Sequence, residues 1–470
     1  MNNFLSNIRR FLNFVIGLYF TDYKNSISKY KFDNIIVTPL RGAENCWVDY
    51  YIAIKYSKII SCSVVLMRPN LIPFGVYERS GKIKWYINLL LSFVKFYLII
   101  FLLKIKGVKY YLINADESEK VDISNNVTLG VEEFLRRYYG CRDYGKFENS
   151  DLIKNNITHV FNNLEKTIIN LKSKSSVLVT SHAIYEWSIA YNIFNDNNLR
   201  CMVWGANIYN SQILKVSNKP LQIGIPKGRI YKDKEIDFTK RIEGTAIDQP
   251  MKWSGSSEPS VTEFLSRYNR IVTLAPNCVW DGDTNVRDSF FSGIYDWITK
   301  TIDFAILNPS IGFIIRIHPA EGNMWAFRPS LWKMLNSSII KQNNILVIPP
   351  DMQISTLELA KKSNIFVFYS GIVGLEANLL GINVCCVSNS IFGKVKGVRV
   401  VNSLDEYHYA LLHEYYDNNE GIIESADVFN KGVCIENHPG SEETMFTNPY
   451  IKGFYVQPEL ESFFEQHVLE

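Results

Sequence analysis

The sequence lacks the features that mark several classes of protein. Among its 470 residues, 26 Gly and 16 Pro are ordinary shares, which argues against a fibrous or disordered chain. Fifty Lys and Arg against 47 Asp and Glu leave a net charge of only +3, so we expect no nucleic acid as partner. The eight cysteines form no C-x-x-C pair and no Cys/His spacing of the zinc type, which fits a reducing cytoplasm and predicts no bound metal.

Long uninterrupted apolar runs are also scarce. Arg9 and Arg10 precede a short apolar stretch, but no small-residue cleavage site follows, so we expect an amphipathic helix and not a signal peptide. The longest run, Trp85–Leu103, is interrupted by Lys95, and a charge at the centre of a lone span is costly. It predicts a helix packed inside a domain. The alternative is a helix on a membrane surface, which would make the protein peripheral on the inner face of the cytoplasmic membrane.

Hydrophobic residues make up 47% of the chain, enough for two large α/β cores. Apolar, β-branched runs alternate with helical patterns, as in βαβ units of a parallel sheet. Strands are predicted at Asn34–Val37, Ser63–Met67, Val108–Ile113, Ser176–Thr180, Arg200–Trp204, Ile271–Ala275, Gly312–Ile317, Ile345–Ile348, Ile365–Tyr369 and Val384–Ser388. Helices of the second half are predicted at Val286–Asp303, Pro329–Leu335, Ser355–Lys361 and Val373–Leu380.

A small, polar segment, Trp253–Ser260, has the composition of a linker. We therefore predict an α/β fold of two Rossmann-like, doubly wound domains that face a cleft, which closes when donor binds. The expected limits are 1–255 for the N-terminal domain and 256–440 for the C-terminal domain. Residues 441–470 are expected to return to the N-terminal domain.

The sharpest motif is a turn between a buried strand and a helix. Ser370 and Gly371 follow the strand, and the helix carries Gly374 and Glu376. Glycines let backbone N–H groups approach a phosphate closely, and a helix N-terminus attracts negative charge. An acidic residue in the second turn is placed for the hydroxyls of a ribose. The alternative is a tight turn with a capping serine, which leaves Glu376 unexplained.

A second motif places three polar residues at another strand end of the same half. Arg316, His318 and Glu321 surround Pro319, which lacks an N–H and stops the strand. A histidine there is placed to stabilise charge on a departing phosphate, and a purely structural histidine is the alternative.

Two further loops carry weaker patterns. Asp281 and Asp283 lie in a Gly-containing turn after Ile271–Ala275, where a carboxylate would act as general base. An ordinary turn explains them as well. His182 and Tyr185 follow Ser176–Thr180, which predicts that they face the cleft from the first domain and contact an acceptor.

Together these segments resemble bacterial capsule and lipopolysaccharide glycosyltransferases of GT-B fold, which carry an H-P motif and a Ser-containing phosphate turn. The stretches that carry the resemblance are "RIHPAE" (316–321), "YSGIVGLEANLLGINV" (369–384), "PNCVWDGDTN" (276–285), "TSHAIYEW" (180–187) and "GKVKGVRVVNSLDEY" (393–407). Related motifs occur in transferases of sialic acid and Kdo. The H-P and Ser-Gly turns are also similar to those of non-hydrolysing UDP-GlcNAc 2-epimerases.

The resemblance implies a metal-independent glycosyltransferase without a cofactor. It would move a sugar from a nucleotide sugar, CMP-linked donors among the options, to a surface polysaccharide or lipid-linked glycan. By resemblance, His318, Ser370 and Gly371 would meet the phosphate, and Glu376 the ribose; Asp281 or Asp283 would be the base. A sugar-nucleotide 2-epimerase and an inactive transferase-like scaffold of polysaccharide assembly are the two alternatives.

Overall fold

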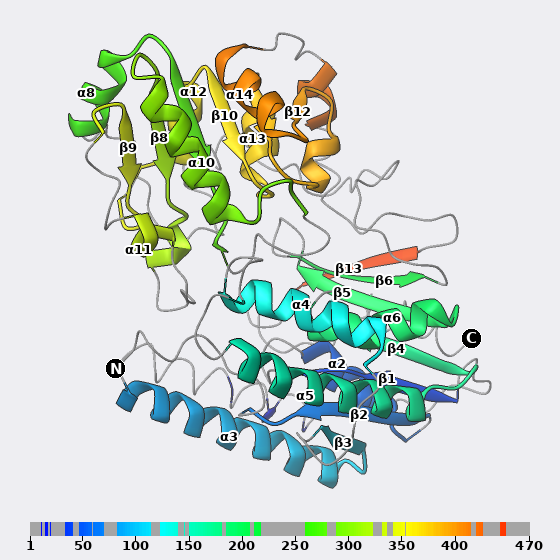
Figure 1. The fold of residues 1–470 in the computed structure, drawn as a ribbon. Helices are drawn as coiled ribbons and strands as arrows, with labels where there is room; N and C mark the ends of the chain where they lie inside the picture. The colour runs from blue at the N-terminus through cyan, green and yellow to red at the C-terminus, as the bar shows by residue number, and fades with distance from the viewer. Residues whose placement is uncertain are drawn as a thin grey trace.

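The computed structural model of the chain shows two α/β domains, each built on its own sheet (Figure 1). The structure describes residues 11, 15, 16, 19, 33–40, 47–58, 60–69, 82–113, 123–139, 145, 150–180, 185–206, 211–217, 259–279, 288–322, 331–335, 342–352, 354–414, 420–425 and 442–447. The predicted fold class, two doubly wound α/β sheets, is confirmed.

The first sheet has the order β13-β6-β5-β4-β1-β2-β3. Its strands are β1 (Asn34–Val37), β2 (Ser61–Met67), β3 (Lys109–Ile113), β4 (Ser176–Thr180), β5 (Arg200–Ala206), β6 (Ser211–Ser217) and β13 (Glu442–Thr447). The strands from β1 to β5 pair in parallel, whereas β6 and β13 extend the sheet antiparallel. The chain thus returns to the first sheet after building the second.

Helices cover both faces of the first sheet, which explains why its central strands β1 and β4 are mostly apolar. They are α2 (Trp47–Tyr56) and α3 (Lys82–Ile105) on one face, and α4 (Asn125–Tyr139), α5 (Ser150–Leu171) and α6 (Glu186–Asp196) on the other. Successive side chains of a strand point to opposite faces. Ile35 and Val37 accordingly pack against α2 and α3, and Ile36 packs against the other three helices.

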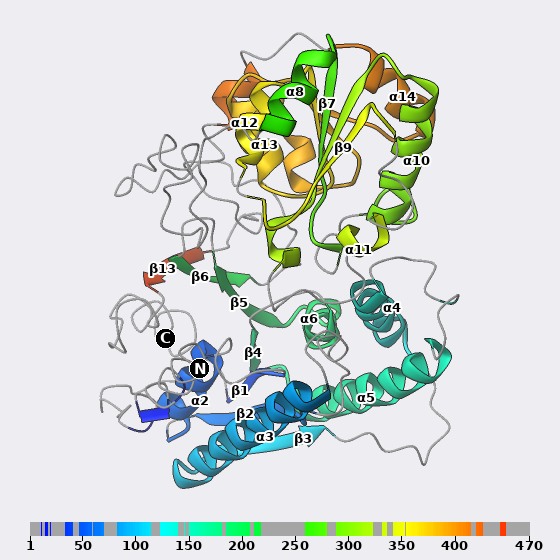
Figure 2. The same ribbon diagram turned by 90° about the vertical axis from the view of Figure 1, so that its left-hand side faces the viewer.

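The second sheet has the order β12-β11-β10-β7-β8-β9, and every pair is parallel. Its strands are β7 (Ile271–Ala275), β8 (Gly312–Arg316), β9 (Ile345–Ile348), β10 (Ile365–Phe368), β11 (Val384–Cys386) and β12 (Val398–Val400). The helices are α8 (Pro259–Arg267), α10 (Ile294–Leu307), α11 (Leu331–Leu335), α12 (Thr356–Lys361), α13 (Val373–Leu379) and α14 (Leu404–Leu412). Figure 2 shows this domain stacked above the first.

Each of the predicted strands is present, with ends that differ by a few residues. β6, β12 and β13 were not predicted. β12 has only three residues, β6 pairs with both β5 and β13, and β13 is held at the edge of the sheet by β6. The prediction that a helix begins at Val286 was wrong, because α10 begins at Ile294 after Gly293, whose φ of 153° does not continue a helix. Of the predicted linker, only Pro259 and Ser260 are described, and they open α8.

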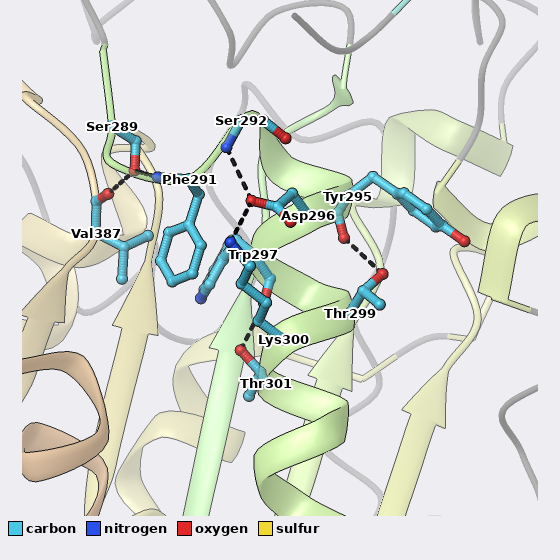
Figure 3. A network of polar contacts seen from close by, with 10 residues as sticks. All are labelled: Ser289, Phe291, Ser292, Tyr295, Asp296, Trp297, Thr299, Lys300, Thr301 and Val387. Carbon is cyan, nitrogen blue, oxygen red and sulfur yellow. Dashed lines mark hydrogen bonds and ion pairs between the residues drawn. The ribbon is translucent and has the colours of Figure 1, made fainter. Parts of the chain in front are cut away.

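The start of α10 is fastened to the carboxyl edge of the second sheet by polar contacts (Figure 3). Ser289 Oγ donates to the carbonyl of Val387, just beyond β11. Asp296 accepts hydrogen bonds from the Ser292 N–H at 2.9 Å and from Lys300 Nζ at 3.1 Å. A carboxylate in the first turn also interacts favourably with the helix dipole. These contacts hold α10 in place beside the strand ends that form the candidate site.

Further along α10, a buried polar triad links it to α14. The Tyr407 hydroxyl accepts from Trp297 Nε1 at 2.9 Å and shares a 2.7 Å hydrogen bond with Thr301 Oγ1. All three side chains are buried in the core between α10, α14 and the sheet. Burial raises the pKa of Tyr407, which stays a neutral hydrogen-bonding group.

We expect Tyr407→Phe to destabilise the protein by about 1–3 kcal/mol, because it leaves the buried Trp297 N–H without an acceptor. Tyr409→Phe is the matched control on the same helix. Its side chain is 53% exposed, so its substitution is expected to change stability by less than about 0.5 kcal/mol. Urea unfolding followed by circular dichroism measures both. Equal stability of the two variants would show that the triad contributes nothing.

Candidate functional site

The second sheet reverses its strand order at β7, and this reversal locates the candidate site. From β7 the chain first builds outward through β8 and β9, then crosses to the other side for β10, β11 and β12. In open α/β sheets, ligands bind outside the carboxyl ends of the strands at this switch point, where the flanking connections diverge. The site is therefore expected beyond the ends of β7 and β10.

The register of the strands brings two polar residues together at that point. Ala275 of β7 is opposite Phe368 of β10, and Asn277 and Ser370 each lie two residues beyond this pair. Asn277 Oδ1 accepts a hydrogen bond of 2.9 Å from the Ser370 N–H. The bond joins the two loops across the switch point and orients the start of the Ser-Gly turn.

The Ser370 hydroxyl distinguishes this turn from an ordinary structural one. The residue is only 7% exposed, and its Oγ makes no hydrogen bond with any described part of the chain. Buried hydroxyls are usually satisfied, and an unsatisfied one costs about 1–3 kcal/mol. A group kept at that cost beside a switch point is suited to an external ligand that accepts or donates a hydrogen bond.

His318 lies on the neighbouring strand end, and contacts at Nδ1 orient its ring. Leu274 pairs with Ile315, so Asn277 and His318 are each three residues beyond that pair. His318 Nδ1 accepts a 3.2 Å hydrogen bond from the Ala320 N–H, and Cys278 Sγ is 3.1 Å from the same nitrogen. A nitrogen that accepts carries no proton, so the neutral ring holds its proton on Nε2. His318 is exposed, and it can donate from Nε2 to an anionic group.

The glycines of the turn have different roles. A Cβ on Gly374 would be 2.4 Å from the Phe368 ring, so the absence of a side chain lets α13 pack against β10. A Cβ on Gly371 would meet nothing closer than Asn277 Nδ2 at 3.5 Å, an ordinary contact. Gly374 therefore serves the fold, while Gly371 has room for a methyl group in this structure.

The predicted helix after the turn is short. α13 has 7 residues, two turns, so its dipole is a weak source of positive charge. Ser370 and His318 are consequently better candidates for phosphate contacts than the helix end. Glu376 is only 5% exposed, and it lies in the first turn of α13, close in sequence to the Ser-Gly turn.

Arg316 and Glu321 have structural partners. Arg316 donates to the carbonyls of Pro349 at 2.6 Å and Met352 at 3.0 Å, so its guanidinium holds the loop after β9. Burial lowers the pKa of Arg316 to about 10. Glu321 accepts from the Trp332 N–H at 3.1 Å and links the turn after His318 to α11. Both side chains are buried, and these contacts direct them toward the protein.

Three predicted site residues, Asp281, Asp283 and His182, lie outside the described residues. The structure adds two that the sequence analysis missed, Asn277 and Cys278. Asn277 lies beside a proline just beyond a buried strand, as His318 does, but its amide suggested no chemistry by itself. Cys278 is recognised only through its contact with His318, because a cysteine in an apolar run is indistinguishable from a core residue.

The first sheet reverses its order in the same way, between β1 and β4. Across this point Trp187 Nε1 donates to the Thr38 carbonyl at 2.8 Å. Tyr185, just before α6, has a φ of 58°, and its N–H donates to Glu133 Oε2 at 2.8 Å. A positive φ is strained for a side chain such as tyrosine, and strain of this kind gathers at ligand sites. The Tyr185 ring itself is 2% exposed, so the prediction that it faces the cleft was wrong.

One described ion pair joins the two domains. Arg136 of α4 lies 3.4 Å from the carboxylate of Asp288, whose own carbonyl accepts from the Asn389 N–H beyond β11. The Asp288 side chain is 53% exposed, and exposed pairs are worth about 0–1 kcal/mol. Such a contact aligns the domains but opposes their relative motion only weakly.

No family profile and no curated protein sequence matches the chain. Among solved structures, it is similar to UDP-GlcNAc 2-epimerase from Neisseria meningitidis bound to UDP-GlcNAc (10% identity, TM-score 0.23, 84% of this chain and 98% of that one). It is also similar to the β-Kdo 2,4 transferase KpsC of Thermosulfurimonas dismutans (11%, TM-score 0.32, 54% and 78%) and to E. coli trehalose-6-phosphate protein bound with UDP-2-fluoro glucose (9%, TM-score 0.36, 84% and 94%). At these scores, function has to be derived from the chain's own strand order and contacts.

We expect Gly374→Ala and Gly371→Ala to separate folding from binding. The Gly374→Ala methyl group collides with the Phe368 ring, which should lower stability by about 1–3 kcal/mol or more. Gly371→Ala should fold with near-normal stability, yet weaken any ligand that approaches the backbone of the turn. Thermal unfolding and nucleotide titration by calorimetry measure both effects. A stable Gly374→Ala variant, or full ligand affinity in Gly371→Ala, would contradict these roles.

Proposed function

We propose that the protein is a metal-independent glycosyltransferase that transfers a sugar from a nucleotide-sugar donor to a surface polysaccharide or lipid-linked glycan acceptor. The single observation that carries the proposal is the buried, unsatisfied Ser370 hydroxyl at the switch point of the second sheet. Together with the exposed His318 on the adjacent strand end, it offers donors to a diphosphate or phosphodiester. The sequence resemblance to capsule and lipopolysaccharide transferases supports the same assignment.

In this proposal the donor nucleotide binds to the second domain. Ser370 and the backbone of Gly371 contact the phosphate. Asn277 orients the turn by accepting a hydrogen bond from the Ser370 N–H. Glu376 binds the ribose hydroxyls. Arg316 and Glu321 position this platform by fixing the loops on either side of His318, and need not touch the donor.

The chemical step releases a nucleotide with negative charge growing on its phosphate. His318 donates a hydrogen bond from Nε2 to that phosphate as the glycosidic bond breaks, because Ala320 and Cys278 occupy Nδ1. Asp281 or Asp283 acts as the base that takes the proton of the acceptor hydroxyl. Ser370 and His318 meet the phosphate charge without a metal ion in this mechanism.

The acceptor binds to the first domain in the same proposal. The strained Tyr185 backbone and the nearby Glu133 mark the corresponding switch point there. Contact with the acceptor is assigned to His182, which precedes Tyr185 in the sequence. The exposed Arg136–Asp288 pair allows the domains to close on the bound donor.

We expect Ser370→Ala to weaken nucleotide binding by about tenfold or more while leaving stability equal or higher. The substitution removes a hydroxyl that has no partner among the described residues, so we expect folding to lose nothing. Ser363→Ala is the matched control at the opposite end of β10. Its hydroxyl donates to the Leu359 carbonyl at 2.7 Å, so its loss should lower stability and leave binding unchanged. Calorimetric titration measures nucleotide binding by each variant, and thermal unfolding measures its stability. Unaltered binding in Ser370→Ala removes the main support for this site.

We expect the protein to release free nucleotide from one class among CMP-, UDP- and GDP-sugars when acceptor is present. His318→Ala should lower kcat by about 10², because its hydrogen bond strengthens as charge develops, whereas Glu376→Ala should mainly raise the donor KM. Steady-state kinetics with and without EDTA measures this. Epimerised sugar nucleotide without nucleotide release would instead indicate the epimerase. If the parent shows no turnover and both His318→Ala and Glu376→Ala keep full function in cells, the protein would be an inactive scaffold of polysaccharide assembly. Loss of turnover in EDTA would contradict metal independence.

A further inference from the structure

The long helix α3 presents an apolar stripe to solvent along its outer side. We call this stripe the outer face of α3, and it comprises Leu90, Val94, Tyr97, Leu98, Phe101 and Ile105. Their spacing of three and four residues places them on one side of the helix. Leu90 is 65% exposed and Phe101 62% exposed, values far above those of side chains that contribute to a core.

The opposite side of α3 is fixed to the first domain. Ile99, Leu102 and Leu103 are buried in the core that α3 shares with α2 and the sheet. Among the described helices, none is both long and apolar enough to cross a membrane. The buried side of α3 thus holds the helix on the first domain, and its outer face remains exposed to solvent.

Other exposed apolar side chains adjoin the outer face. Tyr19 lies beside the C-terminal end of α3, since Lys106 Nζ is 5.2 Å from its ring. With Ile16, this brings eight of the twenty large exposed hydrophobic residues of the described chain into this region. Figures 1 and 2 both show α3 and β3 on the side of the first domain far from the second.

The charge of this region has one sign. Residues 82–113 contain six Lys and no Asp or Glu. Lys104 is exposed between Phe101 and Ile105 of the apolar stripe, and the aromatic rings of the stripe suit the boundary between water and lipid. A second copy of the chain would bring two basic faces together, and like charges repel. An anionic lipid surface complements both the apolar and the basic groups.

We propose that the outer face of α3 docks on the surface of an anionic lipid bilayer, with the helix lying in the plane of the interface. The proposal rests on the exposure and charge of the first domain, and is independent of the chemistry at Ser370. Its consequence for the molecule is that the first domain sits at the membrane, with the second domain facing away from it.

Cosedimentation with vesicles tests this without measuring activity. The full chain is mixed with vesicles of phosphatidylglycerol and phosphatidylcholine in equal parts, or of phosphatidylcholine alone. We expect binding to the anionic vesicles, weakened by salt, and at least about tenfold lower partitioning of Phe101→Asp and Leu90→Asp. Lys104→Glu should weaken the preference for anionic lipid. Leu307→Asp is the matched control, since Leu307 is 79% exposed at the end of α10 in the other domain.

Circular dichroism confirms that each variant is folded, and analytical ultracentrifugation reports oligomeric state. The proposal is overturned if the parent chain binds neither vesicle, or if Phe101→Asp and Leu90→Asp bind as well as the parent. It is equally overturned if Leu307→Asp loses as much binding as they do. A parent dimer that Phe101→Asp dissociates, with no vesicle binding, would assign the outer face to a second copy. Loss of turnover by Ser370→Ala has no bearing on any of these results.

Discussion

The reversal of strand order at β7 is the constraint on which the candidate site depends. Parallel pairing aligns the carboxyl ends of β8, β7 and β10 at one edge, and the reversal sends the connecting segments of β7 and β10 to opposite sides. Asn277, His318 and Ser370 are 41 to 93 residues apart in pairs, yet register alone places them at one level. The hydrogen bond from the Ser370 N–H to Asn277 then closes the gap between two of the three loops.

The buried polar groups around the site differ in their hydrogen bonds to the backbone. The interior tolerates a charged group only when it is paired, and Arg316 and Glu321 obtain their partners from backbone carbonyl and N–H groups of adjacent loops. The Ser370 hydroxyl has no such partner among the described residues. The cost of leaving it unsatisfied is offset by the packing of β10 and α13, where Gly374 permits close contact with Phe368.

The two domains are joined more firmly by covalent connections than by the described contacts. The chain passes from β6 to α8, builds the second sheet, and returns from α14 to β13, which pairs with β6 along six residues. Two crossings limit how far the domains can separate. The exposed Arg136–Asp288 pair adds little energy, so small relative motions remain inexpensive.

The sequence by itself determined the α/β class, the ten strands with mixed helical segments between them, and the positions of Ser370 and His318 at strand ends. Continuous apolar runs and Gly- or Pro-containing turns are local properties of the sequence, so strands and their ends can be predicted from short segments. Tertiary structure decided the rest. The strand order, the Asn277–Ser370 bond, the tautomer of His318, the structural duties of Arg316 and Gly374, and the solvent-facing side of α3 all depend on which distant segments pack together. Contacts across 93 residues leave no mark in the spacing of a motif, because the register of paired strands creates them only when the sheet forms.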